Sequence, residues 1–234
     1  MKPHPATETP PVAAYEAVIF DWDGTLMDST AHIVGALQGA CRDLGLRVPP
    51  ADEAGWVIGL SLQAALYRLV PELGADRVEA FIARYRVHHG RMQHQVQLFA
   101  GQDRLLQDLH AAGVVLGVAT GKSRPGLDAS LDQLGLQALF QATRTADEAR
   151  GKPDPDMLLQ LLDELRLNPA RVLMVGDTTH DVLMARAAGV DSLAVAYGAH
   201  RPDLLQSARP TALVSSVDDM QGWVRARTRV LPET

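Results

Sequence analysis

The sequence predicts an α/β protein whose core is a doubly wound parallel sheet, with an all-α domain inserted after the first strand. Short apolar runs that are typical of buried strands alternate with stretches of helical periodicity, which favours parallel strands covered by helices on both faces. One block, roughly residues 30–97, shows helical patterns only. Three of the apolar runs end in polar turns, as strands do at the ligand-binding edge of Rossmann-like sheets.

Each predicted element rests on its pattern of apolar residues. The first strand, residues 17–20, is a short apolar run that Gly24 brings to an end. The helix at 30–44 places apolar side chains on one face at intervals of three and four residues. The same reasoning predicts, in chain order, helices at 60–69, 77–88 and 102–112, a strand at 114–119, a helix at 125–134, an extended piece at 140–144, a helix at 155–165, a strand at 172–175, a helix at 178–188, strands at 192–196 and 212–214, and a helix at 217–227.

These elements divide the chain into three parts. Residues 1–14 are rich in Pro, Thr and Ala and have no apolar stretch, so we expect a flexible tail and neither a signal peptide nor a membrane span. Residues 15–28 and 98–234 carry the strands and form the predicted Rossmann-like core. Residues 29–97 form the predicted helical domain, which interrupts the core between its first and second strands.

Composition argues against several classes of protein. The chain has 234 residues, 47% of them apolar, which is enough for a full core. Its net charge of −6 argues against binding to nucleic acid or to an anionic membrane, because both need a basic face. No segment reaches 18 apolar residues, so no membrane span is expected. Cys41 is the only cysteine, which excludes an intrachain disulfide and favours a cytoplasmic protein.

Two carboxylates lie where the first strand ends, in the run Asp21-Trp22-Asp23-Gly24-Thr25. Because side chains alternate along a strand, Asp21 and Asp23 are expected on one side, with Trp22 packed against the core on the other. Neighbouring carboxylates repel each other unless a cation lies between them, and Mg²⁺ is the commonest such cation at phosphate sites. One carboxylate can then attack phosphorus while the other moves protons. The alternative is an acidic turn, since Asp-Gly is a common turn dipeptide.

Polar residues follow two further strands. One strand leads into Thr120-Gly121 and another into Gly176-Asp177, and between them Lys152 lies in a Gly-Lys-Pro-Asp-Pro run. In open α/β sheets, ligands bind outside the carboxyl ends of the strands. We therefore expect the three polar strand exits to form one site.

With these motifs the chain resembles the haloacid dehalogenase superfamily of phosphohydrolases, and within it the phosphoglycolate-phosphatase-like branch with a helical cap. The superfamily's four motifs occur in order. Asp-x-Asp-x-Thr begins at Asp21, the strand-ending threonine is Thr120, the lysine is Lys152, and Gly-Asp-x-x-x-Asp contains Asp177 and Asp181. The resemblance covers all of the chain but its N-terminal tail. It implies Mg²⁺-dependent hydrolysis of a small, phosphoglycolate-like phosphomonoester through an aspartyl-phosphate.

The resemblance also implies a role for each motif residue. Asp21 would be the nucleophile and a Mg²⁺ ligand, while Asp23 would be the general acid and then the general base, with its main-chain carbonyl on Mg²⁺. The Thr120 hydroxyl and the Gly121 N–H would hold the phosphoryl oxygens, and a Cβ at position 121 would obstruct that close approach. Lys152 would neutralise Asp21 and the phosphoryl group.

The last motif supplies two more carboxylates. Asp177 would bind Mg²⁺ directly. Asp181 follows four residues later, so both are expected on one helix face, with Asp181 further in, where it would hold a metal-bound water or position Lys152. The alternative for Asp181 is a helix-start charge. Lys122 is expected to face solvent, with help in holding the anion as the alternative. His180 is expected to be exposed or to lie outside the metal's ligands.

The helical domain is expected to act as a cap that sets specificity and closes over the substrate. Hinges are expected at residues 27–30 and 99–101, and residues 59–61 would reach the substrate. A cap that seals completely requires a small leaving group. A cationic cap residue would support a substrate that carries a carboxylate, and the candidates are Arg68, Arg84 and Arg86.

Two alternatives to a phosphatase stay open, namely a sugar phosphomutase and a non-catalytic protein that binds a phospho-ligand. Thr25 resembles the phosphatases, because such mutases more often carry Val there. A binding protein would be expected to have lost Asp21, Asp23 or Lys152, and none is missing. Asp23 also argues against dehalogenation, which needs no acid for the leaving group. The expected partner is a small phosphorylated metabolite, and the expected assembly is a monomer or a weak homodimer.

Overall fold

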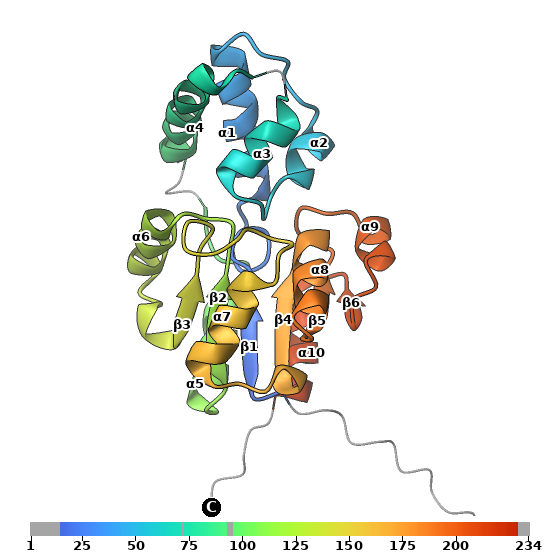
Figure 1. The fold of residues 1–234 in the computed structure, drawn as a ribbon. Helices are drawn as coiled ribbons and strands as arrows, with labels where there is room; N and C mark the ends of the chain where they lie inside the picture. The colour runs from blue at the N-terminus through green and yellow to red at the C-terminus, as the bar shows by residue number, and fades with distance from the viewer. Residues whose placement is uncertain (1–14, 72, 93–95, 229–234) are drawn as a thin grey trace, which may run out of the picture.

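The structure, a computed structural model, describes residues 15–71, 73–92 and 96–228 (Figure 1). The tail predicted at residues 1–14 lies outside them. Among the described residues, no helix combines the length and the apolar character that a membrane crossing needs.

A six-stranded parallel sheet forms the centre of the core, as the alternation of strand and helix signals predicts. The strand order is β3-β2-β1-β4-β5-β6, the order of a Rossmann sheet, so the first strand lies between the second and the fourth. The strands are β1 (Ala17–Phe20), β2 (Val115–Ala119), β3 (Ala142–Arg144), β4 (Val172–Gly176), β5 (Asp191–Val195) and β6 (Ala212–Val214).

Helices cover both faces of the sheet. Around the sheet these are α5 (Gln102–Ala111), α6 (Arg124–Leu134), α7 (Asp156–Leu165), α8 (Thr179–Ala187), α9 (Pro202–Ser207) and α10 (Val217–Arg227), with 3₁₀ turns at Gln137–Leu139 and Pro169–Arg171. The inserted helices are α1 (Thr30–Asp43), α2 (Ala51–Trp56), α3 (Leu62–Leu69) and α4 (Val78–Met92), with a 3₁₀ turn at Ala75–Arg77.

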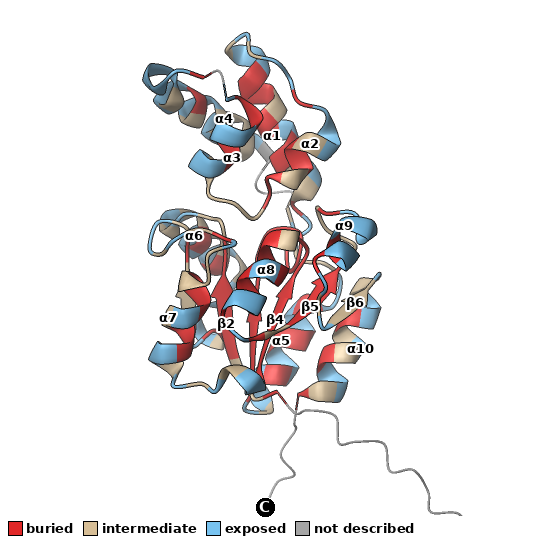
Figure 2. Cartoon of the chain, turned by 45° about the vertical axis from the view of Figure 1, so that its right-hand side comes forward, coloured by how far each residue is buried: buried red, intermediate tan, exposed pale blue. Residues whose placement is uncertain are grey.

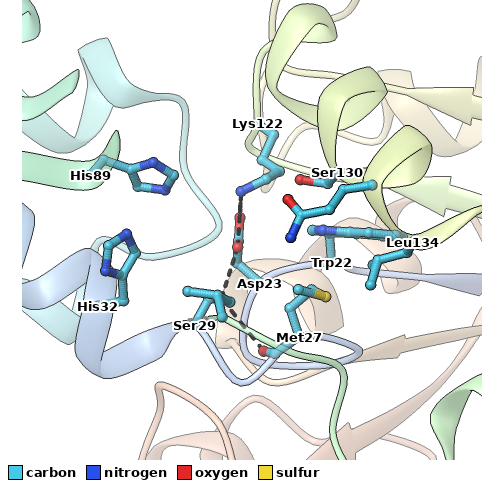
Figure 3. A pocket seen from close by; sticks show the side chains of 11 residues that line it. Trp22, Asp23, Met27, Ser29, His32, His89, Lys122, Ser130 and Leu134 are labelled. Carbon is cyan, nitrogen blue, oxygen red and sulfur yellow. Dashed lines mark hydrogen bonds and ion pairs between the residues drawn. The ribbon is translucent and has the colours of Figure 1, made fainter. Parts of the chain in front are cut away.

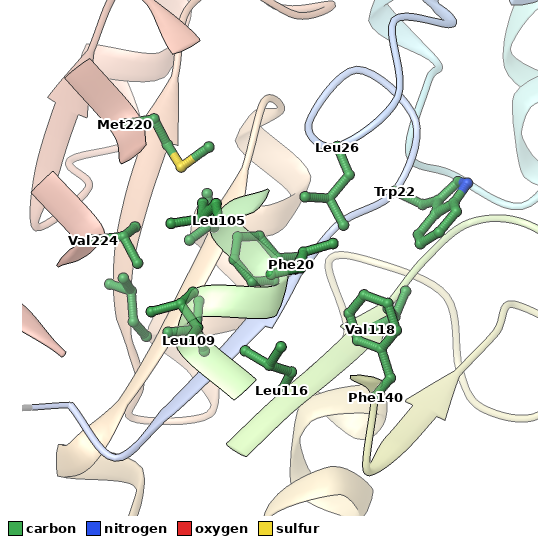
Figure 4. Packing of buried hydrophobic residues seen from close by; sticks show 14 of the residues in the cluster. Phe20, Trp22, Leu26, Leu105, Leu109, Leu116, Val118, Phe140, Met220 and Val224 are labelled. Carbon is green, nitrogen blue, oxygen red and sulfur yellow. The ribbon is translucent and has the colours of Figure 1, made fainter. Parts of the chain in front are cut away.

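Strand β1 is buried on both faces of the sheet, because its alternating side chains are all apolar and helices cover both faces. Val18 and Phe20 pack with apolar residues of α5, α6 and α10, whereas Ala17 and Ile19 pack with those of α7 and α8. Figure 4 shows Phe20 among side chains of α5, α10 and β2, and Figure 2 shows the buried strands between half-exposed helices. Trp22 is fully buried beside Phe140, which confirms that it packs in the core.

The inserted helices α1–α4 pack around a hydrophobic cluster of their own, which includes Leu37, Cys41, Leu66 and Phe81. In Figure 1 this helical block lies beyond the edge of the sheet to which the strands point. Its two connections to the core run side by side, because the Asp28 N–H donates to the Gln97 carbonyl at 2.9 Å and the Phe99 N–H to the Leu26 carbonyl at 2.9 Å. The block is therefore joined to the core by a paired, two-stranded stem.

Most predicted elements occur, and their ends differ for physical reasons. The helix predicted at 60–69 begins at Leu62, because the Ser61 hydroxyl caps it by accepting the Ala64 N–H at 3.2 Å. The helix predicted at 77–88 begins one residue later, after a 3₁₀ turn, and extends to Met92. The helices α2 and α9 were not predicted, since six residues are too few to show helical periodicity.

Hydrogen bonds and ring contacts around Trp56 join the helical block to the core. The carbonyl oxygen of Trp56, at the end of α2, accepts hydrogen bonds from His180 Nε2 at 3.0 Å and from His200 Nε2 at 2.9 Å. The Thr179 N–H donates to His200 Nδ1, so His200 is neutral with its proton on Nε2. The Arg68 guanidinium lies 3.8 Å from the centre of the Trp56 ring. We call Trp56, Arg68, His180 and His200 the Trp56 junction.

Protonation of His180 should weaken the folded protein. Burial lowers the pKa of His180 to about 4, from 6.5. Between these values the unfolded chain binds a proton that the folded chain does not, so stability falls as the pH falls through this window. Between pH 7.5 and pH 5.5 we expect wild type to lose about 1 kcal/mol more than His180→Gln, whose amide can still donate to Trp56. Urea unfolding of both proteins at both pH values measures this difference in the free energy of unfolding. An equal loss in wild type and His180→Gln would contradict the lowered pKa of His180.

Candidate active site

The functional residues meet at the carboxyl ends of three neighbouring strands. Asp21 follows β1, Thr120 follows β2 and Asp177 follows β4. β1 lies between β2 and β4, where the strand order reverses direction, and this is the position at which open α/β sheets bind ligands. The fold therefore brings together residues that are distant in the sequence, as the three polar strand exits predict.

Lys152 lies at the centre of this site. Its Nζ is 2.8 Å from Asp21 Oδ1 and 2.6 Å from Asp181 Oδ1, and its side chain has no exposed surface. Burial disfavours the charged lysine, but the two carboxylates outweigh burial and raise its pKa. Lys152 is thus a buried cation held between the predicted nucleophile and the last carboxylate of the fourth motif.

Three buried carboxylates, those of Asp21, Asp177 and Asp181, each place one oxygen within 4.8 Å of the others. Asp177 accepts hydrogen bonds from the Thr25 hydroxyl at 2.9 Å and from the Ala199 N–H at 2.7 Å. Asp21 Oδ2 is buried and has no hydrogen-bond partner among the described residues. This cluster has room and oxygen donors for a hard cation.

The charges of the cluster also fit a bound cation. Burial raises the pKa of Asp21 to about 7, although Lys152 opposes the rise. Burial and the neighbouring carboxylates Asp21 and Asp181 raise the pKa of Asp177 well above its usual value. One lysine does not balance three buried carboxylates, and a divalent cation would supply the missing positive charge.

Asp181 is positioned by a helix cap. It is the third residue of α8, where the Asp181 N–H donates to the Thr178 hydroxyl and the Thr178 N–H donates to Asp181 Oδ2 at 3.1 Å. Asp177 precedes that cap and lies outside the helix, so the expectation that Asp177 and Asp181 share a helix face was wrong. Asp181 is a helix-start charge and a partner of Lys152 at the same time.

Asp23 is bound on a different side. Lys122 Nζ lies 3.0 Å and 2.9 Å from the two Asp23 oxygens, and the Ser29 hydroxyl donates to Oδ1 at 2.8 Å. Burial alone would raise the pKa of Asp23, but Lys122 and Ser29 outweigh it and lower the pKa. Lys122 is 14% exposed, so the expectation that it faces solvent was wrong. The reason is that Asp23 lies within reach of its side chain.

Two histidines of the helical block lie near this ion pair. Figure 3 shows His32 and His89 across from Lys122 and Asp23, around a small cavity of about 20 Å³. The two rings are 4.7 Å apart, and burial lowers the pKa of His89 to about 4, so His89 is neutral near pH 7. His32 Nε2 is buried and has no hydrogen-bond partner among the described residues. The helical block therefore presents two neutral polar side chains, those of His32 and His89, to the ion pair of Lys122 and Asp23.

Gly121 lies directly under a loop of the helical block. A Cβ at Gly121 would lie 2.5 Å from the Leu60 carbonyl oxygen and 2.6 Å from the Gly59 carbonyl oxygen. Neighbouring Thr120 is buried, and its hydroxyl accepts the Lys122 N–H at 3.2 Å. The need for glycine therefore arises from the loop above it, in addition to the close approach of a phosphoryl group that the sequence suggested.

A cleft of about 920 Å³ separates the helical block from the core. Its floor includes Asp21, Asp23, Thr120, Gly121 and Lys122, so each predicted residue at the ends of β1 and β2 lines it. The opposite wall comes from α1, α3 and α4 and from residues 57–62. This volume lies near the upper end of the range for small-molecule sites, roughly 300–1,000 Å³.

Several residues of the site were missed in the sequence. His180 is buried against Trp56, which rules out the exposed placement. Ser29 and Thr178 each precede a helix, a position that a Ser or Thr before an apolar helical run signals. The Thr178 side chain caps its helix, whereas the Ser29 hydroxyl donates to Asp23 and makes no side-chain cap. The Ala199 N–H and His200 have no such signal, because they reach the site only through the loop after β5.

This chain matches the model of the family that its motifs indicate, and it is similar to several known proteins. The family model described as haloacid dehalogenase-like hydrolase matches residues 18–195. "Tyrosine-protein kinase PtkA" of Mycobacterium tuberculosis is 35% identical over 88% of this chain and 71% of its own length. "Probable phosphatase IndB" of Dickeya dadantii is 35% identical over 89% of this chain and 93% of its own length.

More distant matches agree. A phosphoglycolate phosphatase of Aliivibrio fischeri is 30% identical over 82% of this chain and 89% of its own length. The crystal structure of a haloacid dehalogenase-like hydrolase from Bacteroides fragilis superimposes with a TM-score of 0.80 at 27% identity, covering 88% of this chain and 99% of that one. The resemblance drawn from the four motifs is confirmed: this chain belongs to the haloacid dehalogenase-like hydrolase family.

Proposed function

We propose that the protein is a Mg²⁺-dependent phosphatase that hydrolyses a small phosphomonoester through an aspartyl-phosphate on Asp21. The observation that carries this proposal is the buried lysine between two carboxylates, beside a third carboxylate and under a cleft of substrate size. Membership of a hydrolase family that includes phosphatases supports the same reaction. We expect a cytoplasmic localisation, since the chain has a single cysteine.

The chemistry follows from what each side chain can reach. Asp21 Oδ2, the oxygen without a hydrogen-bond partner, is free to attack phosphorus as the bond to the leaving oxygen breaks. Asp23, which Lys122 and Ser29 hold ionised in this structure, would take up a proton before giving it to the leaving alcohol. It would then take a proton from the water that attacks the aspartyl-phosphate. Inorganic phosphate leaves, and the Asp21 carboxylate is restored. Thr120 and Gly121 would hold the phosphoryl oxygens during both steps.

Asp21 and Asp177, with the main-chain carbonyl of Asp23, would hold Mg²⁺, and Asp181 would lie outside these ligands. When bound, the cation offsets the repulsion between an attacking carboxylate and a phosphate. Asp181 has a second task in this proposal, because its contact with Lys152 fixes where the lysine charge lies relative to Asp21.

Residues 29–97 would act as a cap that opens and closes on the stem formed by the segments around Met27 and Leu98, which pair in an antiparallel bridge. The cap loop at Gly59 and Leu60 already lies over the phosphate-binding turn at Gly121. The cleft has room for a leaving group larger than the two carbons of phosphoglycolate. Small sugar phosphates and nucleoside monophosphates stay within the proposed substrate range.

Other acceptors for the phosphoryl group remain as alternatives. A phosphomutase would return it to the sugar, and the relative PtkA is described as a tyrosine-protein kinase, which transfers a phosphoryl group to protein. Hydrolysis is favoured here because the chain belongs to a hydrolase family and several of its relatives are described as phosphatases. A protein that only binds a phospho-ligand would have no use for the Asp21 and Lys152 pair.

Phosphate release should require both Mg²⁺ and Asp21. With a panel of small phosphomonoesters, we expect Asp21→Asn to lower the rate at least about 1,000-fold, because the nucleophile is lost. A chelator should abolish release, and added Mg²⁺ should restore it. Asp103→Asn, an exposed aspartate in the first turn of α5, is the control and should keep wild-type activity.

The result separates the alternatives. Substrate turnover without phosphate release would indicate a mutase, and transfer of labelled phosphate to a protein acceptor would indicate a kinase-like transferase. Binding of phosphomonoesters without any turnover, by a folded protein with Mg²⁺, would overturn the phosphatase proposal.

Gly121→Ala should test the contact between the cap loop and the phosphate-binding turn. Its Cβ would collide with the Gly59 and Leu60 carbonyl oxygens, so we expect kcat/KM to fall at least about tenfold, because closure is displaced. Gly35→Ala is the control, since its Cβ would meet nothing within 4 Å. Unchanged kcat/KM in Gly121→Ala would show that the cap loop does not need this position, and a circular dichroism spectrum confirms folding.

A further inference from the structure

The wall of the cleft opposite Asp21 and Asp23 contains a cation that has no partner among the described residues. Along α4 the residues that line the cleft recur at helical intervals, at positions 82, 85, 86, 89 and 90. This spacing places them in one stripe on the face of α4 that looks into the cleft. Arg86 belongs to the stripe and is the only arginine among the described residues that line the cleft.

The other two candidate arginines of the helical block have other surroundings. Arg68 stacks on the Trp56 ring at the junction with the core. Arg84 and Arg86 are both exposed, but Arg84 does not line the cleft, and it contributes to lowering the pKa of Asp43 on α1. Among the described residues, Arg86 forms no ion pair and no side-chain hydrogen bond. It is therefore the arginine whose charge is available to a molecule in the cleft.

Among the described residues that line the cleft, each aspartate already has at least one partner of its own. Asp21 is bound to Lys152 and Asp23 to Lys122, while Asp147 accepts the Arg124 N–H and the Thr145 hydroxyl. The neighbouring His89 is neutral near pH 7, because burial lowers its pKa to about 4. An anion that enters the cleft beside α4 would meet the Arg86 guanidinium without competition from these groups.

We propose that Arg86 is a specificity-determining residue that binds a second anionic group, a carboxylate or a second phosphate, on the leaving-group side of the substrate. A guanidinium presents a planar fork of donors that matches the oxygens of either anion. Asp21 would receive the transferred phosphoryl group at the floor of the cleft, while Arg86 holds the far end of the same molecule from α4. This inference rests on the proposed phosphatase function. It adds that the leaving group of the substrate is negatively charged.

Two pairs of probes separate the two anions. 3-Phosphoglycerate and glycerol 3-phosphate differ in a carboxylate, and glucose 1,6-bisphosphate and glucose 6-phosphate differ in a second phosphate. For the member with the second anionic group in at least one pair, we expect Arg86→Ala to raise KM about 10- to 100-fold. The change should be less than about threefold for the partner that carries a single phosphate. The pair that responds identifies the anion. Arg86→Lys should recover part of the loss, and Arg84→Ala, on the same helix and off the cleft, should behave as wild type.

A binding measurement keeps this test apart from the test of the phosphatase. Calorimetric titration of the same probes into wild type and Arg86→Ala does not depend on turnover. If wild type binds the probe with two anionic groups at least about tenfold more tightly than its partner with a single phosphate, and Arg86→Ala loses that preference, the inference holds even when no phosphate is released. Equal affinity of wild type for both members of both pairs, or an equal loss for both members in Arg86→Ala, would overturn it.

Discussion

The site depends on one buried cation, Lys152, that lies between Asp21 and Asp181. Removing charged groups from water is expensive, and a buried pair is tolerated only when its geometry satisfies the remaining donors and acceptors. The fold meets that condition through the Thr178 cap, which fixes Asp181, and through the end of β1, which fixes Asp21. A third carboxylate, Asp177, leaves the cluster short of positive charge, so the same arrangement that stabilises Lys152 also favours a divalent cation.

The position of the site was predictable because parallel strands end at one edge of the sheet. The motifs at Asp21, Thr120 and Asp177 needed only that rule to be placed together. The partner of Lys122 was not predictable in the same way. Its contact with Asp23 joins residues 99 positions apart and depends on side-chain reach, on which strand periodicity gives no information. The shared helix face proposed for Asp177 and Asp181 failed because a cap begins the helix between them.

Long-range contacts of the inserted helices were equally out of reach. The sequence placed a helical block at residues 29–97 from periodicity, and the part of that segment that the structure describes has four α-helices and a short 3₁₀ turn. The Trp56 junction could not be found, because Trp56 lies in a six-residue helix and meets His180 at a separation of 124 positions. His200 reaches the junction from the loop after β5, where the sequence shows no periodic pattern of apolar residues. Contacts of this kind depend on how two packed units meet.

The two units divide the work of the site between them. In the proposed reaction the core supplies the groups that act on phosphorus, and those groups are bound by other residues of the core, as Asp177 is by Thr25 and Ala199. The helical block supplies the opposite wall, which includes Arg86, and Arg86 has no hydrogen-bond or ion-pair partner among the described residues. Substitutions on α4 can therefore alter which leaving group is held without disturbing the buried charges below. The Gly59 and Gly121 contact and the Trp56 junction limit that freedom, because they fix where the wall stands over the reacting atoms.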